Sequence, residues 1–183
     1  MIIVACGGMS KDILSFIPHE EVFFYDDNKT GYFENYTILG TIDDLCRTRT
    51  DDTVYLGIGS VGQNDTRNRI YNKLTKAGHR VSPLIFPSKI CYGVKMGNNV
   101  VINLNCEIHH DCIIGNNCVL SPRVTLCGAV ELSDNVFIGA GAIIIQNVKV
   151  GQNSIIGAGS VVLKNIEPDS LYYGNPARFI RNI

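Results

Sequence analysis

The residues of this 183-residue chain that are best suited to chemistry are His109, His110 and Asp111. An imidazole ring gains and loses a proton near neutral pH, which suits it to general acid–base catalysis. A neighbouring carboxylate can fix the tautomer of the ring and stabilise the imidazolium that forms. A histidine in a turn is also commonly just a solvated residue. The catalytic interpretation is favoured because both histidines of the repeat described below fall here, beside an acid.

A second set of residues follows short apolar segments near the amino terminus. Gly7 and Gly8 follow the first of these segments, Asp26 and Asp27 follow the second, and Gly59 ends the third. Parallel α/β sheets bind ligands at the carboxyl ends of their strands. A glycine pair lets a phosphate approach backbone N–H groups at a helix start, and the acids can accept hydrogen bonds from a ribose or a base imide. A full G-x-G-x-x-G motif is absent, so the prediction of a nucleotide crevice depends on the three strand ends together.

These segments alternate with helix-like stretches, which favours a small parallel α/β sheet. Thr41, followed three residues later by an acid, is typical of a capped helix start. An amphipathic stretch over 66–77 ends at Gly78, as helices often do. The sequence therefore predicts a Rossmann-like α/β domain over residues 1–82.

From residue 84 to residue 167 the chain repeats every six residues. Each repeat has an aliphatic residue or Met at the same place, through fourteen repeats in one phase, although only 45% of the chain is apolar. The fourteen residues are Leu84, Ile90, Met96, Ile102, Ile108, Ile114, Leu120, Leu126, Leu132, Ile138, Ile144, Val150, Ile156 and Val162. This period is typical of a parallel β-helix, in which each hexad supplies one short strand and one corner.

Strand alternation places the repeated aliphatic residue inside the helix, together with the small residue two positions before it. Cys106, Cys112 and Cys118 occupy that small position, so we interpret them as core residues. Three hexads close one triangular coil. A sandwich of short strands is the alternative, but it would not keep strict phase through its turns. We therefore expect an all-β domain over 83–183, made of this helix and a C-terminal tail.

Composition argues against several classes of function. The formal net charge is −1 with no basic run, so a nucleic-acid partner is not expected. No apolar segment is long enough to span a membrane, and the segment after Met1 lacks the pattern of a signal peptide. Seven cysteines without a CxxC pair favour a reducing, cytoplasmic location and neither disulfides nor a metal site.

Several of these motifs together resemble one family. They are Gly7-Gly8, Asp26-Asp27, Ile58-Gly59 with an Asn64-to-Arg67 helix start, the His-Asp-Cys hexad from Ile108 to Gly115, and the closing Gly-Asn-Pro-Ala-Arg of 174–178. Over essentially its whole length the chain is similar to the bacterial hexapeptide-repeat sugar acetyltransferases, which include sialic acid O-acetyltransferases and nucleotide-amino-sugar N-acetyltransferases. That resemblance, and not the spacing, implies a left-handed β-helix.

Carried over by position, the resemblance implies roles for individual residues. His110 corresponds to the general base and Asp111 to its acidic support, while His109 stands where the family often has Glu. The implied substrate contacts are Gly7, Gly8, Met9, Asp26, Asp27 and Gly59 for the nucleotide sugar, and Asn103 near the sugar amine. The implied acetyl-CoA contacts are Val119, Ala140 and Ala158, largely through backbone groups.

Three departures from the family pattern bear on these roles. Met9-Ser10 stands where the family usually has His-Gly, in the turn expected to hold phosphate. Val119 stands where some members have a polar residue facing the thioester. The β-helix is also expected to be one coil shorter before the histidine.

The function that the resemblance implies is acetyl-CoA-dependent transfer of acetyl to the amine of a nucleotide-linked amino sugar, for surface polysaccharide synthesis. The nucleotide can be UDP, GDP or dTDP. The family also implies a homotrimer with acetyl-CoA in the groove between adjacent β-helices, and no metal. Two alternatives stay open: an O-acetyltransferase acting on a free sugar acid such as sialic acid, and a non-catalytic β-helix scaffold.

Overall fold

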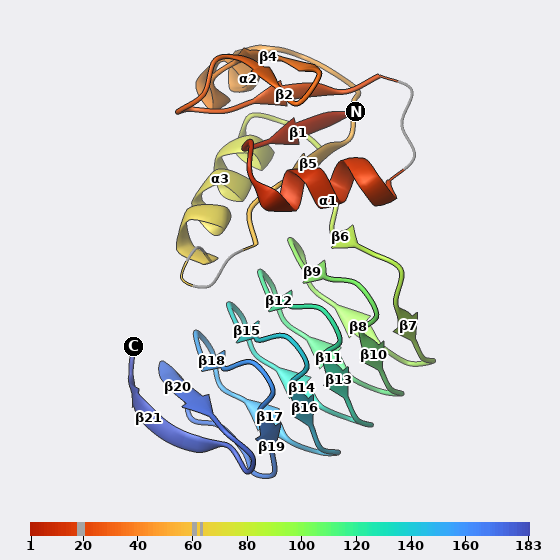
Figure 1. Cartoon of the computed structure of the whole chain (residues 1–183), viewed down its shortest axis with the longest axis vertical. Helices are drawn as coiled ribbons and strands as arrows, with labels where there is room; N and C mark the ends of the chain where they lie inside the picture. The colour runs from red at the N-terminus through yellow and green to blue at the C-terminus, as the bar shows by residue number, and fades with distance from the viewer. Residues whose placement is uncertain (18–20, 60–61, 63) are drawn as a thin grey trace. The chain divides into compact units, whose positions relative to one another are not determined.

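The structure, a computed structural model, describes residues 1–17, 21–59, 62 and 64–183. They form two compact units, Met1–Pro83 and Leu84–Ile183 (Figure 1). Each unit contains a hydrophobic core cluster of its own. Within the described residues, no helix is both long and apolar enough to cross a membrane.

The first unit is a parallel sheet with helices, as the alternation of segments predicts. Its elements are β1 (Ile2–Val4), α1 (Gly8–Phe16), β2 (Phe23–Tyr25), β3 (Gly31–Phe33), β4 (Tyr36–Gly40), α2 (Ile42–Arg47), β5 (Val54–Leu56) and α3 (Asn64–Lys76). The strand order is β3-β4-β2-β1-β5, and all neighbours are parallel except β3 and β4. The apolar β1 lies inside the sheet and is fully buried, as a strand covered on both faces must be.

In this unit the local sequence predicts the start of helix α2 but does not predict the β3–β4 hairpin. Thr41 Oγ1 accepts a hydrogen bond from the Asp44 N–H at 3.2 Å, and the Asp44 carboxylate accepts one from the Thr41 N–H at 2.9 Å. This capping box confirms the predicted start of α2. The β3–β4 hairpin has no comparable signal, because its turn depends on Glu34 at a φ of +53°, a conformation uncommon for this residue type.

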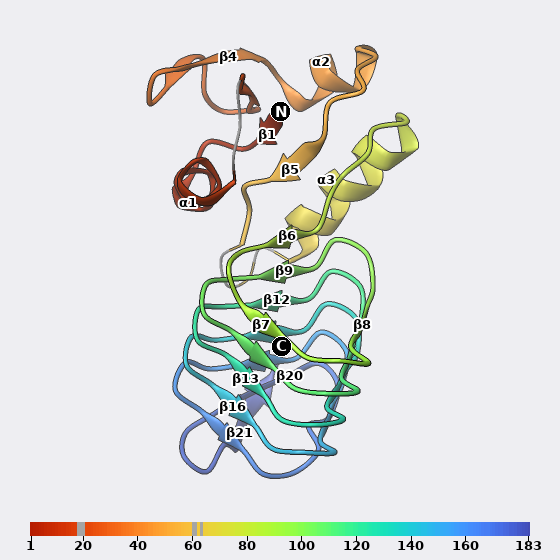
Figure 2. The ribbon, with the colours of Figure 1, turned by 90° about the vertical axis from the view of Figure 1, so that its right-hand side faces the viewer.

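The second unit is a parallel β-helix, as the hexads predict. One sheet holds β7 (Lys89–Ile90), β10 (Glu107–Ile108), β13 (Thr125–Leu126), β16 (Ile143–Ile144) and β19 (Val161–Val162). The next holds β8 (Lys95–Met96), β11 (Ile113–Ile114), β14 (Glu131–Leu132) and β17 (Lys149–Val150). The third holds β6 (Leu84–Ile85), β9 (Val101–Ile102), β12 (Val119–Leu120), β15 (Phe137–Ile138), β18 (Ile155–Ile156), β20 (Ser170–Tyr173) and β21 (Arg178–Asn182). Figure 2 shows the strands following one another around the helix.

From β7 to β19, backbone hydrogen bonds hold each coil to the next, and the paired residues are eighteen positions apart in the sequence. Ile108 pairs with Ile90 on one side and with Leu126 on the other. The repeated aliphatic residues from Ile102 onward are buried and stack into one continuous core. Cys106, Cys112 and Cys118 are also fully buried, as predicted, and burial raises the pKa of the Cys106 and Cys112 thiols.

Every corner from residue 93 to residue 159 uses one residue in the left-handed backbone conformation. It is always the third residue after the repeated aliphatic one. The set is Gly93, Asn99, Asn105, Asp111, Asn117, Arg123, Ala129, Asn135, Gly141, Asn147, Asn153 and Gly159. Among residues with a side chain, asparagine and aspartate adopt this conformation most readily, which explains why asparagine dominates the set.

Along one edge these asparagines form a ladder of side-chain hydrogen bonds. Asn99 Nδ2 donates to Asn117 Oδ1 at 2.7 Å, and Asn117 Nδ2 donates to Asn135 Oδ1 at 2.8 Å. Asn135 Nδ2 donates to Asn153 Oδ1 at 3.0 Å. Asn153 Nδ2 donates in turn to the carboxylate of Asp169 at 2.6 Å. A carboxylate only accepts, so it is a suitable last member of the ladder.

The hexad phase does not extend back to the first repeat. Ile85, and not Leu84, lies beside Ile102 in the neighbouring coil. Only three residues, 86–88, separate β6 from β7, whereas four residues separate each pair of successive strands from β7 to β19. None of the three is left-handed, and Pro87 holds φ at roughly −65°. The prediction of one unbroken phase from Leu84 is therefore wrong, because this corner is one residue shorter.

The residues predicted as a tail form a hairpin that extends one sheet. β20 pairs in parallel with β18 and antiparallel with β21. Tyr172 and Phe179 pack edge to face across the hairpin, with ring centroids 5.6 Å apart. The C-terminal segment thus belongs to the β-helix unit.

The asparagine ladder is expected to stabilise the β-helix beyond the corner conformation itself. Asn135→Gly removes its side-chain bonds but keeps the left-handed corner, because glycine adopts positive φ without strain. We expect it to lower the free energy of unfolding by roughly 1–3 kcal/mol. The matched control is Asn147→Gly, at an exposed left-handed corner outside the ladder. Urea unfolding followed by circular dichroism compares the two, and equal losses would show that the ladder adds nothing.

Candidate functional site

His110 and Asp111 lie in the corner that follows β10. Ile108, fully buried in the core, sets the register of this corner. His110 is the second residue after it, and Asp111 is the third, at the left-handed position with a φ of +59°. Their side chains are 67% and 64% exposed, respectively. The hexad therefore presents an imidazole and a carboxylate together on the outside of the β-helix.

The two side chains form a hydrogen-bonded pair. Asp111 Oδ2 lies 2.9 Å from His110 Nδ1. An ionised carboxylate only accepts hydrogen bonds, so the proton of a neutral ring is on Nδ1 and the lone pair on Nε2. Such a ring can take a proton at Nε2 from a bound nucleophile. The pair has the arrangement of a general base and the acid that orients it.

The structure does not bring Asn103 to this pair within the chain. Asn103 follows β9, so it lies on a different edge of the helix from His110, which follows β10. Its Oδ1 accepts a hydrogen bond from the Leu104 N–H at 2.8 Å, and its carbonyl accepts one from Ser88 Oγ at 2.8 Å. Asn103 therefore holds its own corner. His109 lies in the same corner as His110 but is less exposed. Its backbone N–H donates a hydrogen bond to the Leu126 carbonyl in the next coil.

The three residues expected to contact acetyl-CoA belong to the third sheet and the edge that follows it. Val119 begins β12 and its side chain is buried. Ala140 and Ala158 are exposed and occupy the same position in successive corners. Neither alanine N–H makes a hydrogen bond within the described part of the chain. These two N–H groups can bind carbonyl groups of a ligand that lies along this edge.

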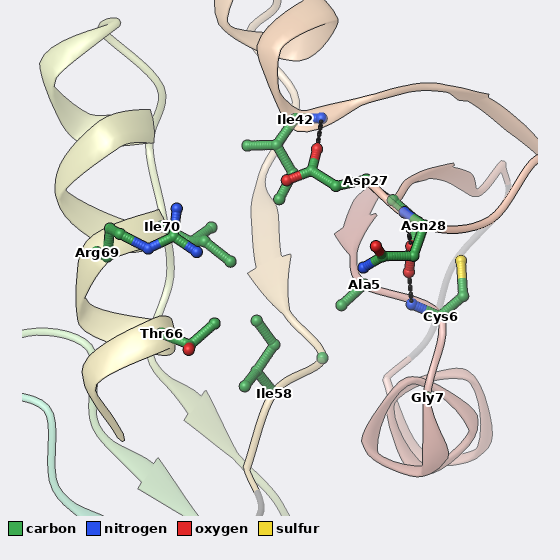
Figure 3. Close-up of a pocket in the computed structure, with 12 residues that line it drawn as sticks. Ala5, Cys6, Gly7, Asp27, Asn28, Ile42, Ile58, Thr66, Arg69 and Ile70 are labelled. Atoms are coloured by element: carbon green, nitrogen blue, oxygen red, sulfur yellow. Dashed lines mark hydrogen bonds between the residues drawn. The ribbon is translucent and has the colours of Figure 1, made fainter. Parts of the chain in front are cut away.

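The first unit contains a cavity of about 270 Å³ at the carboxyl ends of β1, β2 and β5 (Figure 3). The residues that line it are Ala5, Cys6, Gly7, Asp26, Asp27, Asn28, Ile42, Gly57, Ile58, Thr66, Arg69 and Ile70. Of the residues predicted to contact a nucleotide, Gly7, Asp26 and Asp27 are in this lining, and Gly8, Met9 and Gly59 are not. The three predicted strand ends thus do meet at one cavity.

Asp26 holds the loops around the cavity. Its carboxylate accepts hydrogen bonds from the N–H groups of Cys6 at 2.7 Å, Asn28 at 2.8 Å and Lys29 at 3.0 Å. Its side chain is buried, and both oxygens take part in these bonds. Burial, and secondarily the charge of Asp26, raise the pKa of the Cys6 thiol to about 12. Asp26 therefore fastens the turn after β1 to the turn after β2.

Asp27 is more available to a ligand than Asp26. It is exposed, and its Oδ1 accepts one hydrogen bond, from the Ile42 N–H at 2.9 Å. The Met9 side chain packs against the backbone of Gly59. A β-carbon added to Gly59 would collide with Met9 Cε. Met9 and Gly59 thus contact each other and do not line the cavity, whereas Asp27 lines it with a carboxylate.

The sequence prediction missed the contribution of α3 to this cavity. Thr66, Arg69 and Ile70 line it from one face of the helix, at the i, i+3, i+4 spacing that brings side chains together. Figure 3 shows Arg69 on the side of the cavity opposite Asp27. Arg69 makes no ion pair with any described residue. The cavity therefore combines a carboxylate, a guanidinium and the apolar walls of three isoleucines, Ile42, Ile58 and Ile70.

In the part of the chain that the structure describes, no group of three His, Cys, Asp or Glu side chains is placed to hold a metal ion. All seven cysteines are free thiols.

Family models match most of the chain. The model of the bacterial transferase hexapeptide, six repeats long, matches residues 93–128 and again residues 129–164. The model of the PglD N-terminal domain matches residues 1–74. Among characterised relatives, GDP-perosamine N-acetyltransferase of Escherichia coli O157:H7 is 29% identical over 122 residues. That match covers 66% of this chain and 54% of the relative, so it spans about half of the relative's length.

Solved structures with the same fold cover nearly all of the chain. The acetyltransferase domain of PglB from Neisseria gonorrhoeae FA1090 is 22% identical, with a TM-score of 0.86 and 98% of each chain covered. WeeI from Acinetobacter baumannii AYE is 20% identical, with a TM-score of 0.74 and 98% of each chain covered. PerB from Caulobacter crescentus, in complex with CoA and GDP-perosamine, is 23% identical, with a TM-score of 0.65, 98% of this chain and 96% of PerB covered. These likenesses confirm the predicted fold, a Rossmann-like unit followed by a left-handed β-helix.

Proposed function

This chain belongs to the bacterial hexapeptide-repeat transferases, and we propose that it transfers acetyl from acetyl-CoA to the amine of a nucleotide-linked amino sugar. The observation that carries this proposal is the His110–Asp111 pair, in which the Asp111 carboxylate occupies Nδ1 and leaves Nε2 open. Relatives support it by their ligands and names: PerB is solved with CoA and GDP-perosamine, and the PglB domain is solved with acetyl-CoA.

The proposed reaction is a direct transfer with one proton acceptor. The amine of the sugar is mostly protonated near neutral pH and must lose a proton to attack. Nε2 of His110 takes that proton as the nitrogen bonds to the thioester carbonyl carbon. The C–S bond then breaks, and the departing CoA thiolate takes the second proton that the nitrogen loses on becoming an amide. Asp111 stabilises the imidazolium, and a corner N–H binds the developing oxyanion. A general base of this kind contributes roughly 10²–10⁴ to the rate.

Acetyl-CoA is proposed to lie along the edge formed by Ala140 and Ala158. Both residues are exposed there, and their N–H groups can donate to the amide carbonyls of the pantetheine arm. Val119 would contact the same ligand only through its backbone, because its side chain is buried. Bound acetyl-CoA supplies the activated acetyl group as a thioester.

The nucleotide is proposed to occupy the cavity of the first unit. The turn at Gly7, together with Gly8 and Met9 at the start of α1, faces the phosphates with backbone N–H groups. Asp27 accepts hydrogen bonds from the ribose or the base. The isoleucine walls pack against the flat base, and Arg69 supplies positive charge or a donor. Asp26 acts on the shape of this site through its three backbone hydrogen bonds.

This cavity is the reason to prefer a nucleotide-linked acceptor over a free sugar acid. An O-acetyltransferase acting on a free sugar acid such as sialic acid would not need a crevice with these groups. The proposal covers UDP, GDP and dTDP as carriers, because each presents a ribose-type sugar, a diphosphate and a base with an imide-type edge.

The proposal includes a homotrimer. Ile113 and Ile143 occupy outward positions on two different sheets of the β-helix, and both side chains are substantially exposed, at 46% and 39%. Apolar residues on flat strand faces suit contact with other subunits. Light scattering at micromolar concentration is expected to give three times the 20.1 kDa mass of the chain. A monomer would contradict the shared acetyl-CoA groove.

His110 is expected to be the residue on which the rate depends most. His110→Ala should lower kcat by roughly 10²–10⁴ with little change in acetyl-CoA affinity, because only the proton acceptor is lost. Asp111→Ala should cost less, since the carboxylate orients the ring without taking the proton. His109→Ala should cost least. Steady-state kinetics with calorimetric binding of acetyl-CoA makes the comparison.

Two outcomes of this series would overturn the assignment. If the His109→Ala variant lost its activity while the His110→Ala variant kept it, the register carried over from the family would be wrong by one residue. Full activity in both would remove histidine catalysis, and the scaffold interpretation would return.

Asp27 and Arg69 are expected to govern nucleotide binding without affecting acetyl-CoA. Melting temperatures measured with UDP, GDP and dTDP should rise for one of the three, because a ligand of the native state stabilises it. Asp27→Asn and Arg69→Gln should each weaken that nucleotide while calorimetry shows unchanged acetyl-CoA affinity. Asp26→Asn serves as the contrast: it should lower the melting temperature of the free protein, because a charged acceptor of three backbone N–H groups is lost. No response to any nucleotide would favour a free sugar acid as acceptor.

A further inference from the structure

We propose that Gly128 is a positioning residue for His110: its missing side chain leaves the space in which the imidazole lies. This inference rests on the proposed function, because Gly128 acts only through the base. A β-carbon on Gly128 would lie 2.7 Å from both Cε1 and Nε2 of His110, and 3.4 Å from Cδ2. Carbon atoms in contact stand roughly 3.5–4.0 Å apart. The ring and a side chain at residue 128 therefore exclude each other.

The backbone at residue 128 does not itself require glycine. Gly128 is the second residue of its corner, and the same position in neighbouring coils holds Tyr92, His110 and Gln146. None of these four residues has a positive φ. The three atoms nearest to a β-carbon on Gly128 all belong to the His110 ring. The closest neighbour of such a β-carbon among the described residues is thus the ring of the candidate base.

The space that a side chain on Gly128 would fill lies next to Nε2, the reactive nitrogen of the His110 ring. Nδ1 is held by Asp111 at 2.9 Å, so Nε2 is the nitrogen that would take the proton, and Nε2 is one of the two atoms nearest to Gly128. Asp111 has a similar neighbour one coil earlier: a β-carbon on Gly93 would collide with its Oδ1 and lie 3.4 Å from its Cγ. The His110–Asp111 pair therefore lies between two glycines, Gly93 in the preceding coil and Gly128 in the following one.

A substitution at Gly128 tests this arrangement of the pair more clearly than a substitution at Gly93. Gly93 has a φ of +79°, so a substitution there would also strain the backbone. The atoms nearest to a methyl group on residue 128 belong to the end of an exposed side chain, which can move aside without disturbing the core. The ring would then lose its place against Asp111, and a displacement of about 1 Å at a reacting group can cost roughly 10² in rate.

The test is the substitution Gly128→Ala in the full chain. We expect kcat to fall by roughly 10–10², while acetyl-CoA affinity and melting temperature stay at wild-type values. Gln146→Ala, at the same position one coil further on, is the control and should leave kcat unchanged. A crystal structure of Gly128→Ala should show the imidazole displaced from Asp111. Unchanged kcat and an unmoved ring would overturn the proposal.

A double-mutant cycle with His110→Ala shows whether the glycine acts through the base. In the His110→Ala background the new methyl group has room, so adding Gly128→Ala should cause no further loss of rate. An equal loss in both backgrounds would overturn the proposal, since the methyl group would then be blocking something else. If Gly128→Ala failed to fold but the double variant folded, the clash with His110 would be confirmed. If both failed, the backbone would need glycine and the proposal would fall.

Failure of the proposed function has a different signature. It would appear as full activity in His110→Ala, whatever the ring does in the crystal structure of Gly128→Ala. A displaced ring with unchanged kcat in all variants would place the error in the function and not in the geometry.

Discussion

The eighteen-residue register between coils is the constraint on which the β-helix and its candidate base both depend. Between β7 and β19 the strands donate backbone N–H groups to the carbonyls of the next coil. Each residue there lies directly beside the residues eighteen positions before and after it in the sequence. That register stacks aliphatic residues on aliphatic residues inside the helix. On the outside it sets His110 against Gly128 and Asp111 against Gly93. A single residue inserted between these coils would separate both pairs.

In the first unit a charged side chain has the comparable role. The Asp26 carboxylate joins the turn after β1 to the turn after β2 through the Cys6 N–H, and it holds its own turn through the N–H groups of Asn28 and Lys29. The cavity wall is therefore built from loops that cannot move independently. Asp27 and Arg69 differ from it in having bonding capacity left for a ligand. One acid of the Asp26-Asp27 pair thus shapes the site while the other is available to bind.

Sequence was informative wherever the determinant was local and periodic. The hexads predict the β-helix because each inward position needs an aliphatic side chain, and the Thr41 capping box predicts α2 because its partners are three residues apart. The first coil escaped prediction because Leu84 keeps the aliphatic pattern while the corner containing Pro87 loses one residue. The different tasks of Asp26 and Asp27 depend on backbone groups that are distant in sequence. Arg69 and Gly128 belong to no recognisable sequence motif. Only the fold shows that Arg69 lines the cavity and that Gly128 lies beside the His110 ring.

The central claim, acetyl transfer to a nucleotide-linked amine, is tested most directly by a product assay. The protein is incubated with acetyl-CoA and, in turn, UDP-, GDP- and dTDP-linked 4-amino-4,6-dideoxy sugars, and with free sialic acid. Released CoA thiol and the mass of the sugar are followed together. The account predicts thiol release with one or more of the nucleotide-linked amino sugars, matched by a product heavier by one acetyl group on nitrogen. Acetylation of free sialic acid alone, or no thiol release with any acceptor, would contradict it.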